Sequence, residues 1–308
     1  MRITSAAAFE SSVSTLQRRQ QALSASQEQL TSGKRVLKPS DDPAAAAAAE
    51  RALARISRSD AEQRALSASR NAMQMAESAL GDGGELLQQA REAVVAAGNG
   101  SYTDAERLTL GNALRGLREQ LFAVANRADG AGRYLFGGQG SDGPPLLDSP
   151  GGVIFNGVAG ETLAASGEAS PLSLDGRAAW LQAPDPANPG ATISLFDTLD
   201  QTIGELQTAG RTSAQLAQTV SGGLAGIDAV AANLGSWRAR AGEALNRIDN
   251  IGQRLSQGKL DAQRQRSEAE DLDMVQAISD FQSQQSGYDA ALKTYSIVQR
   301  MTLFDYLR

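Results

Sequence analysis

Apolar residues recur every seven positions at the start of the chain. Phe9, Leu16, Leu23 and Leu30 are seven residues apart, and they alternate with a second line formed by Ala6, Val13, Gln20 and Gln27. A sustained seven-residue repeat with two apolar positions is the pattern of a coiled-coil helix. The pattern therefore predicts a helix over residues 5–30, with two polar layers in its seam.

A second seam of the same kind lies near the other end. Its members alternate at spacings of four and three residues: Met274, Ile278, Phe281, Gln285, Tyr288, Leu292 and Tyr295. Because each terminal helix then carries one apolar stripe, pairing the two helices would bury both stripes. We expect one assembly interface, made of Phe9, Val13, Leu16, Leu23, Leu30, Met274, Ile278, Phe281, Tyr288, Leu292 and Tyr295.

Long helices are also predicted between the two seams. Asp42 is a plausible N-cap before Pro43, and the stripe that follows is Leu66, Met73, Leu80, Leu87 and Val94. This stripe keeps its phase across Gly81–Gly84, so we expect one helix to pass through the glycines. Capping patterns at Thr103-x-x-Glu106 and Ser194-x-x-Asp197 begin further helices, and another long helix is predicted from Thr212 onward.

Prolines separate these helical arms from the middle of the chain. Seven of the nine prolines lie between Pro144 and Pro189, whereas 44–143 and 190–308 contain none. Arg133–Phe136 is predicted to be a short strand, and Val153–Phe155 followed by Asn156-Gly157 predicts a hairpin. The middle of the chain is therefore expected to be a small β-rich insert.

The predicted fold is mainly α, a long antiparallel helical bundle or coiled coil made from both chain termini, with a small β-rich domain inserted mid-chain. Three domains are expected. They are a terminal coiled-coil domain (1–40 plus 264–308), a helical-bundle stem (41–136 plus 191–263) and the β-rich outer domain (137–190).

Composition removes most catalytic chemistry. The 308 residues include no histidine and no cysteine, which excludes imidazole catalysis, thiolate nucleophiles, disulfides and every metal site built on those residues. The net charge of -6 argues against a nucleic-acid partner. No stretch approaches the ~20 apolar residues that span a bilayer, so no membrane insertion is expected. The first ten residues do not predict a cleaved secretory signal.

Four local motifs were considered as sites, and each has a simpler explanation. Residues 138–143 match G-x-G-x-x-G, but Pro144-Pro145 stands where the phosphate-binding helix should begin. Asp41-Asp42 is better explained as a cap, and Asn99-Gly100-Ser101 as a helix-ending turn. The carboxylates of 268–273 lie beside arginines on a solvated helix face. We therefore predict no cofactor, no metal and no enzymatic activity.

The extreme C-terminus is unusually apolar and aromatic. Five of the fourteen aromatic residues fall in the last 28 positions, although chain ends are ordinarily polar and frayed. Such an end is expected to be held by its own core or by a partner. We expect the tail to anchor the chain to neighbouring subunits through Leu303, Phe304, Tyr306 and Leu307.

Several of these segments together resemble the bacterial flagellin family. The resemblance covers about 1–140 and 190–308, and the tail is similar to that of the hook-associated members at the hook–filament junction rather than to filament flagellin. It is carried by Met1–Ile3, Leu30–Val36, Pro39–Ala44, Gly98–Gly100, Asp129–Gly138, Tyr288–Tyr295 and Leu303–Leu307.

The resemblance implies a structural, secreted axial protein of the bacterial flagellum that serves cell motility. It implies a homo-oligomeric ring at the hook–filament junction, contacts with the other junction protein and with flagellin, and a flagellar export chaperone. Export would use the flagellar type III channel without a cleaved signal peptide, which places the protein outside the cell.

Three alternative functions make different demands on the sequence. A filament flagellin would share most of these motifs. A cytoplasmic coiled-coil adaptor would share the alanine- and glutamine-rich heptads but should lack the β insert. A hydrolase working with carboxylates alone would need two acids converging in a pocket, which the sequence does not indicate.

Overall fold

The computed structural model describes the backbone of residues 2–164, 168 and 170–306. Side-chain surroundings are described for 9–164, 168 and 170–297. Of the predicted tail anchors, Leu303, Phe304 and Tyr306 therefore have a described backbone only, and Leu307 lies outside the described residues.

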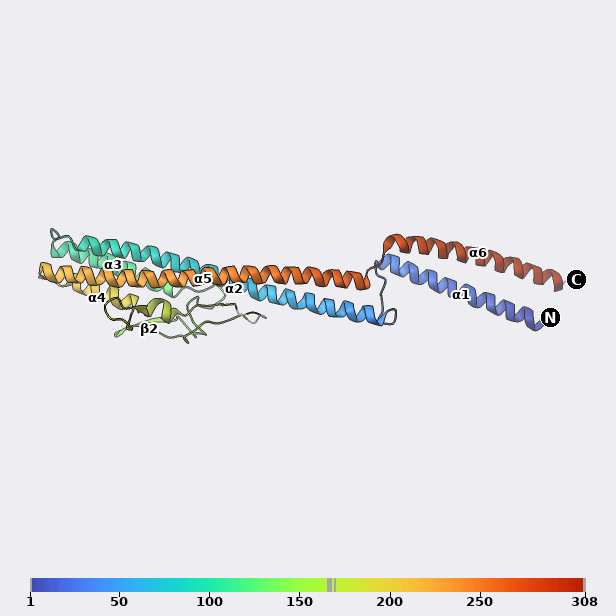
Figure 1. Cartoon of the computed structure of the whole chain (residues 1–308), viewed down its shortest axis with the longest axis horizontal. Coiled ribbons are helices and arrows are strands. Elements are labelled where there is room, and N and C mark those ends of the chain that lie inside the picture. The colour runs from blue at the N-terminus through green and yellow to red at the C-terminus, as the bar shows by residue number, and fades with distance from the viewer. Residues whose placement is uncertain (1, 165–167, 169, 307–308) are drawn as a thin grey trace. The chain divides into compact units, whose positions relative to one another are not determined.

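Six α-helices account for most of the chain (Figure 1), and they confirm the predicted mainly α fold. Their bounds are α1 (Arg2–Ser32), α2 (Pro43–Ala97), α3 (Asp104–Ala125), α4 (Leu195–Gln207), α5 (Ser213–Glu270) and α6 (Met274–Tyr306). The segment between α3 and α4 holds two small antiparallel sheets and one π-helical turn. These are β1 (Leu146–Ser149) with β2 (Gly152–Phe155), η1 (Arg177–Leu181), and β3 (Ala183–Pro184) with β4 (Thr192–Ile193).

Contacts divide the chain into two compact units. Unit 1 consists of 1–59 and 257–308, and unit 2 consists of 60–256. The helices α2 and α5 contribute residues to both units, so the predicted domain border at residue 264 falls inside α5.

Helix ends follow the capping signals in the sequence. The Asp42 Oδ1 atom accepts the backbone N–H of Ala45 at 3.0 Å, and α2 begins at Pro43, as predicted. At the start of α3, Thr103 and Glu106 form a reciprocal capping box. The Ser194 hydroxyl caps α4 by accepting the N–H of Asp197. Each cap satisfies a backbone donor that the helix itself leaves unpaired.

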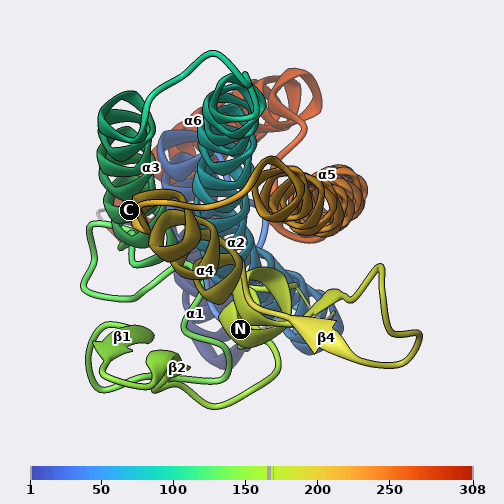
Figure 2. The same ribbon diagram turned by 90° about the vertical axis from the view of Figure 1, so that its left-hand side faces the viewer.

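Unit 2 contains the hydrophobic core. The stripe Leu66, Met73, Leu80, Leu87 and Val94 of α2 is buried along its whole length, and it packs in one cluster with residues of α3, α4 and α5. Viewed end-on, these helices form a bundle with the β1–β2 hairpin and η1 beside α4 (Figure 2). The helix α2 runs unbroken through Gly81–Gly84, which confirms the prediction made from the phase of the stripe.

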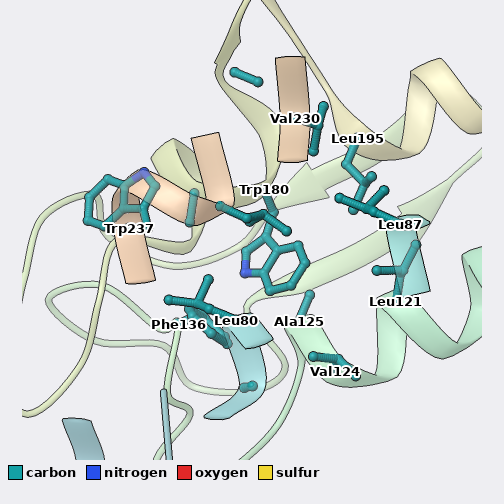
Figure 3. Close-up of a cluster of buried hydrophobic side chains, with 14 of the residues drawn as sticks. Leu80, Leu87, Leu121, Val124, Ala125, Phe136, Trp180, Leu195, Val230 and Trp237 are labelled. Atoms are coloured by element: carbon teal, nitrogen blue, oxygen red, sulfur yellow. The ribbon is translucent and has the colours of Figure 1, made fainter. Parts of the chain in front are cut away.

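The insert shares the core of the stem. Trp180 of η1 is fully buried among Leu80, Ala125 and Phe136 (Figure 3), and its ring meets that of Phe136 edge-on with centroids 5.3 Å apart. A Cβ atom on Gly83 would lie 2.9 Å from the Trp180 ring, so the glycine leaves room for the indole. The insert is therefore packed on its own helical stem.

Two predictions for the insert were wrong in detail. The strand at Val153–Phe155 exists, but its partner is Leu146–Ser149, and the two-residue turn is Pro150-Gly151 rather than Asn156-Gly157. Gly152, at φ +108°, supports this turn because it tolerates a backbone conformation that other residues resist. The Asn156 N–H instead donates to the Pro145 carbonyl at 2.8 Å, which extends the hairpin.

Arg133–Phe136 does not form a strand. Within it only Tyr134 makes a bridge, to Ala128, and the chain turns at Leu135-Phe136, where the Gly137 N–H donates to the Tyr134 carbonyl at 3.3 Å. A Cβ atom on Gly138, at φ +67°, would lie 2.0 Å from the Val158 carbonyl oxygen, so glycine is required at this crossing. The G-x-G-x-x-G segment is a loop with no helix after it, as expected.

Candidate assembly surface of the terminal helices

The helices α1 and α6 of unit 1 form an antiparallel pair. Ser26 donates from Oγ to Gln284 Oε1 at 2.9 Å, and nearer the chain ends Phe9 meets Tyr295 with ring centroids 5.6 Å apart. Residue numbers rise along α1 as they fall along α6, as Figure 1 also shows. This pair brings together the two seams predicted from the heptad patterns.

Small and polar residues occupy the middle of this contact. Besides the Ser26–Gln284 hydrogen bond, Arg19 crosses Gly287 so closely that a Cβ atom there would lie 2.6 Å from Arg19 Nη1. Ala277 and Ala291 are half-buried at heptad spacing on either side of Gln284. Such a contact contributes little apolar burial.

None of the predicted interface residues is fully buried. Val13, Leu16, Leu23, Leu30, Phe281, Tyr288 and Tyr295 are half-buried. The others are exposed over 48% of Phe9, 44% of Met274, 46% of Ile278 and 41% of Leu292. We call these eleven residues the terminal apolar set.

Helix geometry explains why part of the set is turned outward. Each residue advances about 100° around an α-helix. Ile278 and Leu292 directly follow the half-buried Ala277 and Ala291, so they point away from the middle of the contact with α1. The periodicity predicted which α6 residues share a face, but it could not predict which face would meet α1.

Two exposed apolar residues of α6 were not predicted from the sequence. Val275 is 83% exposed and Ile297 is 58% exposed. Neither belongs to the heptad stripe, and this explains why the periodicity did not find them. They enlarge the apolar surface that unit 1 presents to solvent.

Charged groups cluster where the terminal helices meet the ends of α2 and α5. Glu270 pairs with Lys34 at 3.3 Å and with Arg266 at 2.7 Å, and Arg35 pairs with Asp42 at 3.1 Å. The N–H groups of Lys38 and Leu37 hydrogen-bond to Asp41 and hold the pKa of its carboxyl below the ordinary value. The N–H of Ala45 and then the Arg35 guanidinium lower the pKa of Asp42 in the same way. Both acids are therefore structural anchors, as their position before Pro43 predicted.

A buried arginine in unit 2 was not predicted. Arg118 of α3 binds both carboxylate oxygens of Asp148, at 2.6 and 3.0 Å, and both of Asp200, at 3.1 Å each. Its guanidinium lies 5.8 and 5.5 Å from the ring centres of Phe122 and Phe196. The Arg118 hydrogen bonds lower the pKa of Asp148, whereas burial raises the pKa of Asp197.

These charges hold the insert in place rather than forming a reaction site. Arg118 joins β1 to α3 and α4, and Asn126 holds β1 from α3 through two hydrogen bonds to the backbone of Leu146. Within the described ranges, no three acidic side chains are grouped so that they could hold a metal ion. The described helices also include none with the length and apolar character to span a bilayer.

Unit 2 also has two polar clefts. A cleft of about 420 Å³ lies between α4 and α5, beside Glu205, Arg211 and Thr219. A second, of about 650 Å³, lies between α5 and the insert, where Arg240, Glu243 and Arg247 line it. Arg211 pairs with Glu205 at 3.1 Å, and the Thr219 hydroxyl donates to the same carboxylate. Hydrogen bonds from Thr219 and then Gln201 lower the pKa of Glu205 below its ordinary value, which makes this carboxylate a weak base toward the Thr219 hydroxyl.

Comparisons with known proteins show similarity to flagellar proteins. Residues 3–141 match the bacterial flagellin N-terminal helical region. The chain is 28% identical over 327 aligned positions to flagellar hook-associated protein 3 of Salmonella typhimurium, which covers all of both chains. It is 28% identical to the protein of the same name from Escherichia coli over 90% of each chain, and 25% identical to a flagellin of Listeria monocytogenes over 86% of this chain and 84% of the flagellin.

Solved structures share the fold. The flagellar junction protein FlgL from Legionella pneumophila aligns with a TM-score of 0.60 and 17% identity, over 73% of this chain and all of its own. FlgL from Xanthomonas campestris aligns with a TM-score of 0.61 and 19% identity, over 71% of this chain and 99% of its own. Residues 3–141 thus carry the flagellin N-terminal helical region, and the chain as a whole is flagellin-like and resembles flagellar hook-associated protein 3.

Proposed function

We propose that this chain is a structural, non-catalytic protein of the flagellar axial structure that joins the hook to the filament. Similarity over the full length of a hook-associated protein 3 supports this role. In this proposal, 1–40 with 264–308, 41–136 with 191–263, and 137–190 act as the inner, stem and outer parts.

The observation that carries the proposal is the contrast in apolar burial between the two units. The hydrophobic cluster of the described residues lies within 66–251, in unit 2. The large apolar residues of unit 1 whose side chains are described are exposed or half-buried, apart from Val36 between α1 and α2, which is 8% exposed. Full burial of a large apolar side chain contributes about 1.5–3 kcal/mol, so covering the terminal apolar set would strongly favour assembly.

Neighbouring copies are the proposed cover for this set. Copies arranged in a ring would each present the same α1–α6 pair, so every pair could be buried against its neighbours. The polar middle of the pair makes it weak alone. We therefore propose that the terminal helices become firmly ordered only on assembly, which would delay polymerisation until the chain has left the cell.

The remaining partners follow from the family resemblance. The other hook–filament junction protein and flagellin would contact the ring on its two sides, and a flagellar export chaperone would cover the terminal helices before export. Export through the type III channel would need no cleaved signal. The absence of cysteine suits this route, because no disulfide can lock the chain before it is exported.

Deleting 303–308 tests the role of the tail. The shortened protein should keep the stem folded, with the same helical circular dichroism and thermal midpoint for unit 2, but it should fail to enter the axial structure. Swimming of a strain that carries only the shortened protein, with its export measured in the medium, provides the readout. Normal motility would contradict the proposal.

A filament flagellin is the second candidate, favoured by the 25% identity to the Listeria protein. Immunogold labelling separates the two, because a junction protein should label only the base of each filament and a flagellin should label its whole length. A cytoplasmic adaptor would be retained in the cells. Sheared appendages containing the chain would exclude that function.

A further inference from the structure

Four helix ends of unit 1 meet in one small region, which we call the joint (residues 33–42 and 269–273). The helices α1 and α5 end there, and α2 and α6 begin there. The Gly33 carbonyl accepts the N–H of Leu272 at 2.9 Å, and the Glu270 carbonyl accepts the N–H of Arg35 at 2.7 Å. Val36, beside these bonds, is buried. The joint is therefore better packed than the pair of helices that leaves it.

Arg35 contacts three different helix ends within the joint. Its Nη1 pairs with Asp42 Oδ2 at 3.1 Å, and its Nη2 donates to the Ala269 carbonyl at 2.9 Å. Its own carbonyl accepts Gln29 Nε2 at 2.9 Å. One residue thus links the last turn of α1, the cap of α2 and the last turn of α5.

The contact between α1 and α6 does not by itself choose one alignment. Its apolar members repeat every seven residues, so sliding one helix by a heptad places similar apolar residues opposite each other. The Arg19 guanidinium near Gly287 is the end of a flexible side chain, which can move aside. The Ser26–Gln284 bond is a single neutral hydrogen bond, worth little in partly exposed surroundings. A heptad shift displaces a helix by ~10 Å along its axis, a movement that the bonds of the joint would not survive.

We infer that Arg35 sets the register of the α1–α6 pair, as a positioning residue that fixes the end of α1 against the start of α6. The planar guanidinium suits this role because it can bind a carboxylate and a carbonyl at once. The pair would then enter any assembly already aligned. This inference concerns the isolated chain, so it stands or falls independently of the proposed junction function.

The absence of native cysteine gives a direct test in the full-length monomer. Ser26→Cys with Gln284→Cys reports the observed register, and Ser26→Cys with Ala277→Cys reports a register shifted by one heptad. Both pairs are treated with a short thiol–thiol cross-linker at low protein concentration. A heptad shift raises the second intramolecular yield as it lowers the first, whereas general loosening of the helices lowers the first without raising the second.

Arg35→Ala should lower the ratio of the first yield to the second by about threefold, the effect expected when a half-exposed ion pair and a charge-assisted hydrogen bond to a carbonyl are removed. Arg51→Ala, an exposed arginine of α2 in the same unit, is the matched control and should leave the ratio unchanged. Tryptophan fluorescence confirms that unit 2 is intact, because both tryptophans lie there. An unchanged ratio in Arg35→Ala, or an equal fall in both yields, would overturn the inference.

Discussion

Single residues show how charge and packing are combined in unit 2. Arg118 is only 8% exposed, yet its two acidic partners keep about half of their side chains in water, at 52% for Asp148 and 45% for Asp200. Folding therefore removes water mainly from the arginine, and the two carboxylates lose much less of their hydration. It is retained because it makes four charge-assisted hydrogen bonds and its guanidinium lies near the Phe122 and Phe196 rings.

Replacing Arg118 by methionine should destabilise unit 2 by about 2 kcal/mol. Methionine keeps the apolar packing between Phe122 and Phe196 but removes every bond to the hairpin and to α4. The loss should be below the largest values known for broken buried pairs, because water can hydrate the two carboxylates. Urea unfolding followed by tryptophan fluorescence measures it.

Arg64→Ala is the control for that measurement, since Arg64 is an exposed arginine of α2 in the same unit. It should change the unfolding free energy by less than about 0.5 kcal/mol. If Arg118→Met also changed the unfolding free energy by less than about 0.5 kcal/mol, the ion pairs of Arg118 would not contribute to the stability of unit 2.

The sequence contains a signal for the burial of Arg118. Leu114, Arg118 and Leu121 continue one helical stripe with spacings of four and three, and both leucines are fully buried. A charged residue within a buried stripe indicates a buried ion pair. Its partners could not be predicted, because Asp148 and Asp200 come from a strand and a helix that only the folded chain brings to α3.

At the scale of elements, α2 stays helical across three glycines whose helix propensity is low. Gly81, Gly83 and Gly84 each weaken a helix by up to about 1 kcal/mol relative to alanine. Burial of the stripe on either side outweighs this cost. The surroundings of the glycines nevertheless differ. Gly83 faces Trp180, whereas a Cβ atom added to Gly84 would have no heavy atom within 4 Å.

Alanine at these two positions should therefore have opposite effects. Gly84→Ala should stabilise unit 2 by about 0.5–1 kcal/mol through helix propensity. Gly83→Ala should destabilise it by about 1–3 kcal/mol, since the new methyl group must displace a fully buried indole. Thermal unfolding followed by circular dichroism at 222 nm compares the two without relying on Trp180 fluorescence. Equal shifts of the same sign would refute the role assigned to Gly83.

In the terminal helices, the heptad pattern predicts the helices but not how they face each other. Their heptads predicted helices at both ends of the chain, and the structure has α1 and α6 there. Apolar side chains meet at Phe9 and Tyr295, and Ser26, Gln284 and Gly287 lie further along the described contact. A repeat of seven fixes which residues share a stripe; it leaves open the rotation of that stripe toward a partner.

For the whole molecule, the main consequence is a difference in local stability between the two units. Unit 2 has a continuous core, whereas the terminal pair of unit 1 relies on half-buried side chains and on the joint. Regions with few buried apolar contacts open with low free energies, well below that of global unfolding. Assembly would supply the missing burial.

Hydrogen exchange on the monomer tests this difference. Amides within 5–30 and 274–306 should exchange about 100-fold faster than those of the buried stripe between Leu66 and Val94. After incorporation into the axial structure, the same terminal amides should become protected. Strong protection of both terminal helices in the free monomer would contradict the coupling of order to assembly.

The sequence by itself determined the helices, their caps and the stripes that build the core, because these depend on periodicity and on neighbours within a few residues. It also excluded most catalytic chemistry through the absence of histidine and cysteine. Tertiary structure decided the turn of the β1–β2 hairpin, the partners of Arg118, the closure of the joint by Arg35 and the side of α6 that meets α1. Each of these depends on groups distant in sequence, whose approach is settled by packing and by the hydrogen bonds that become available only on folding.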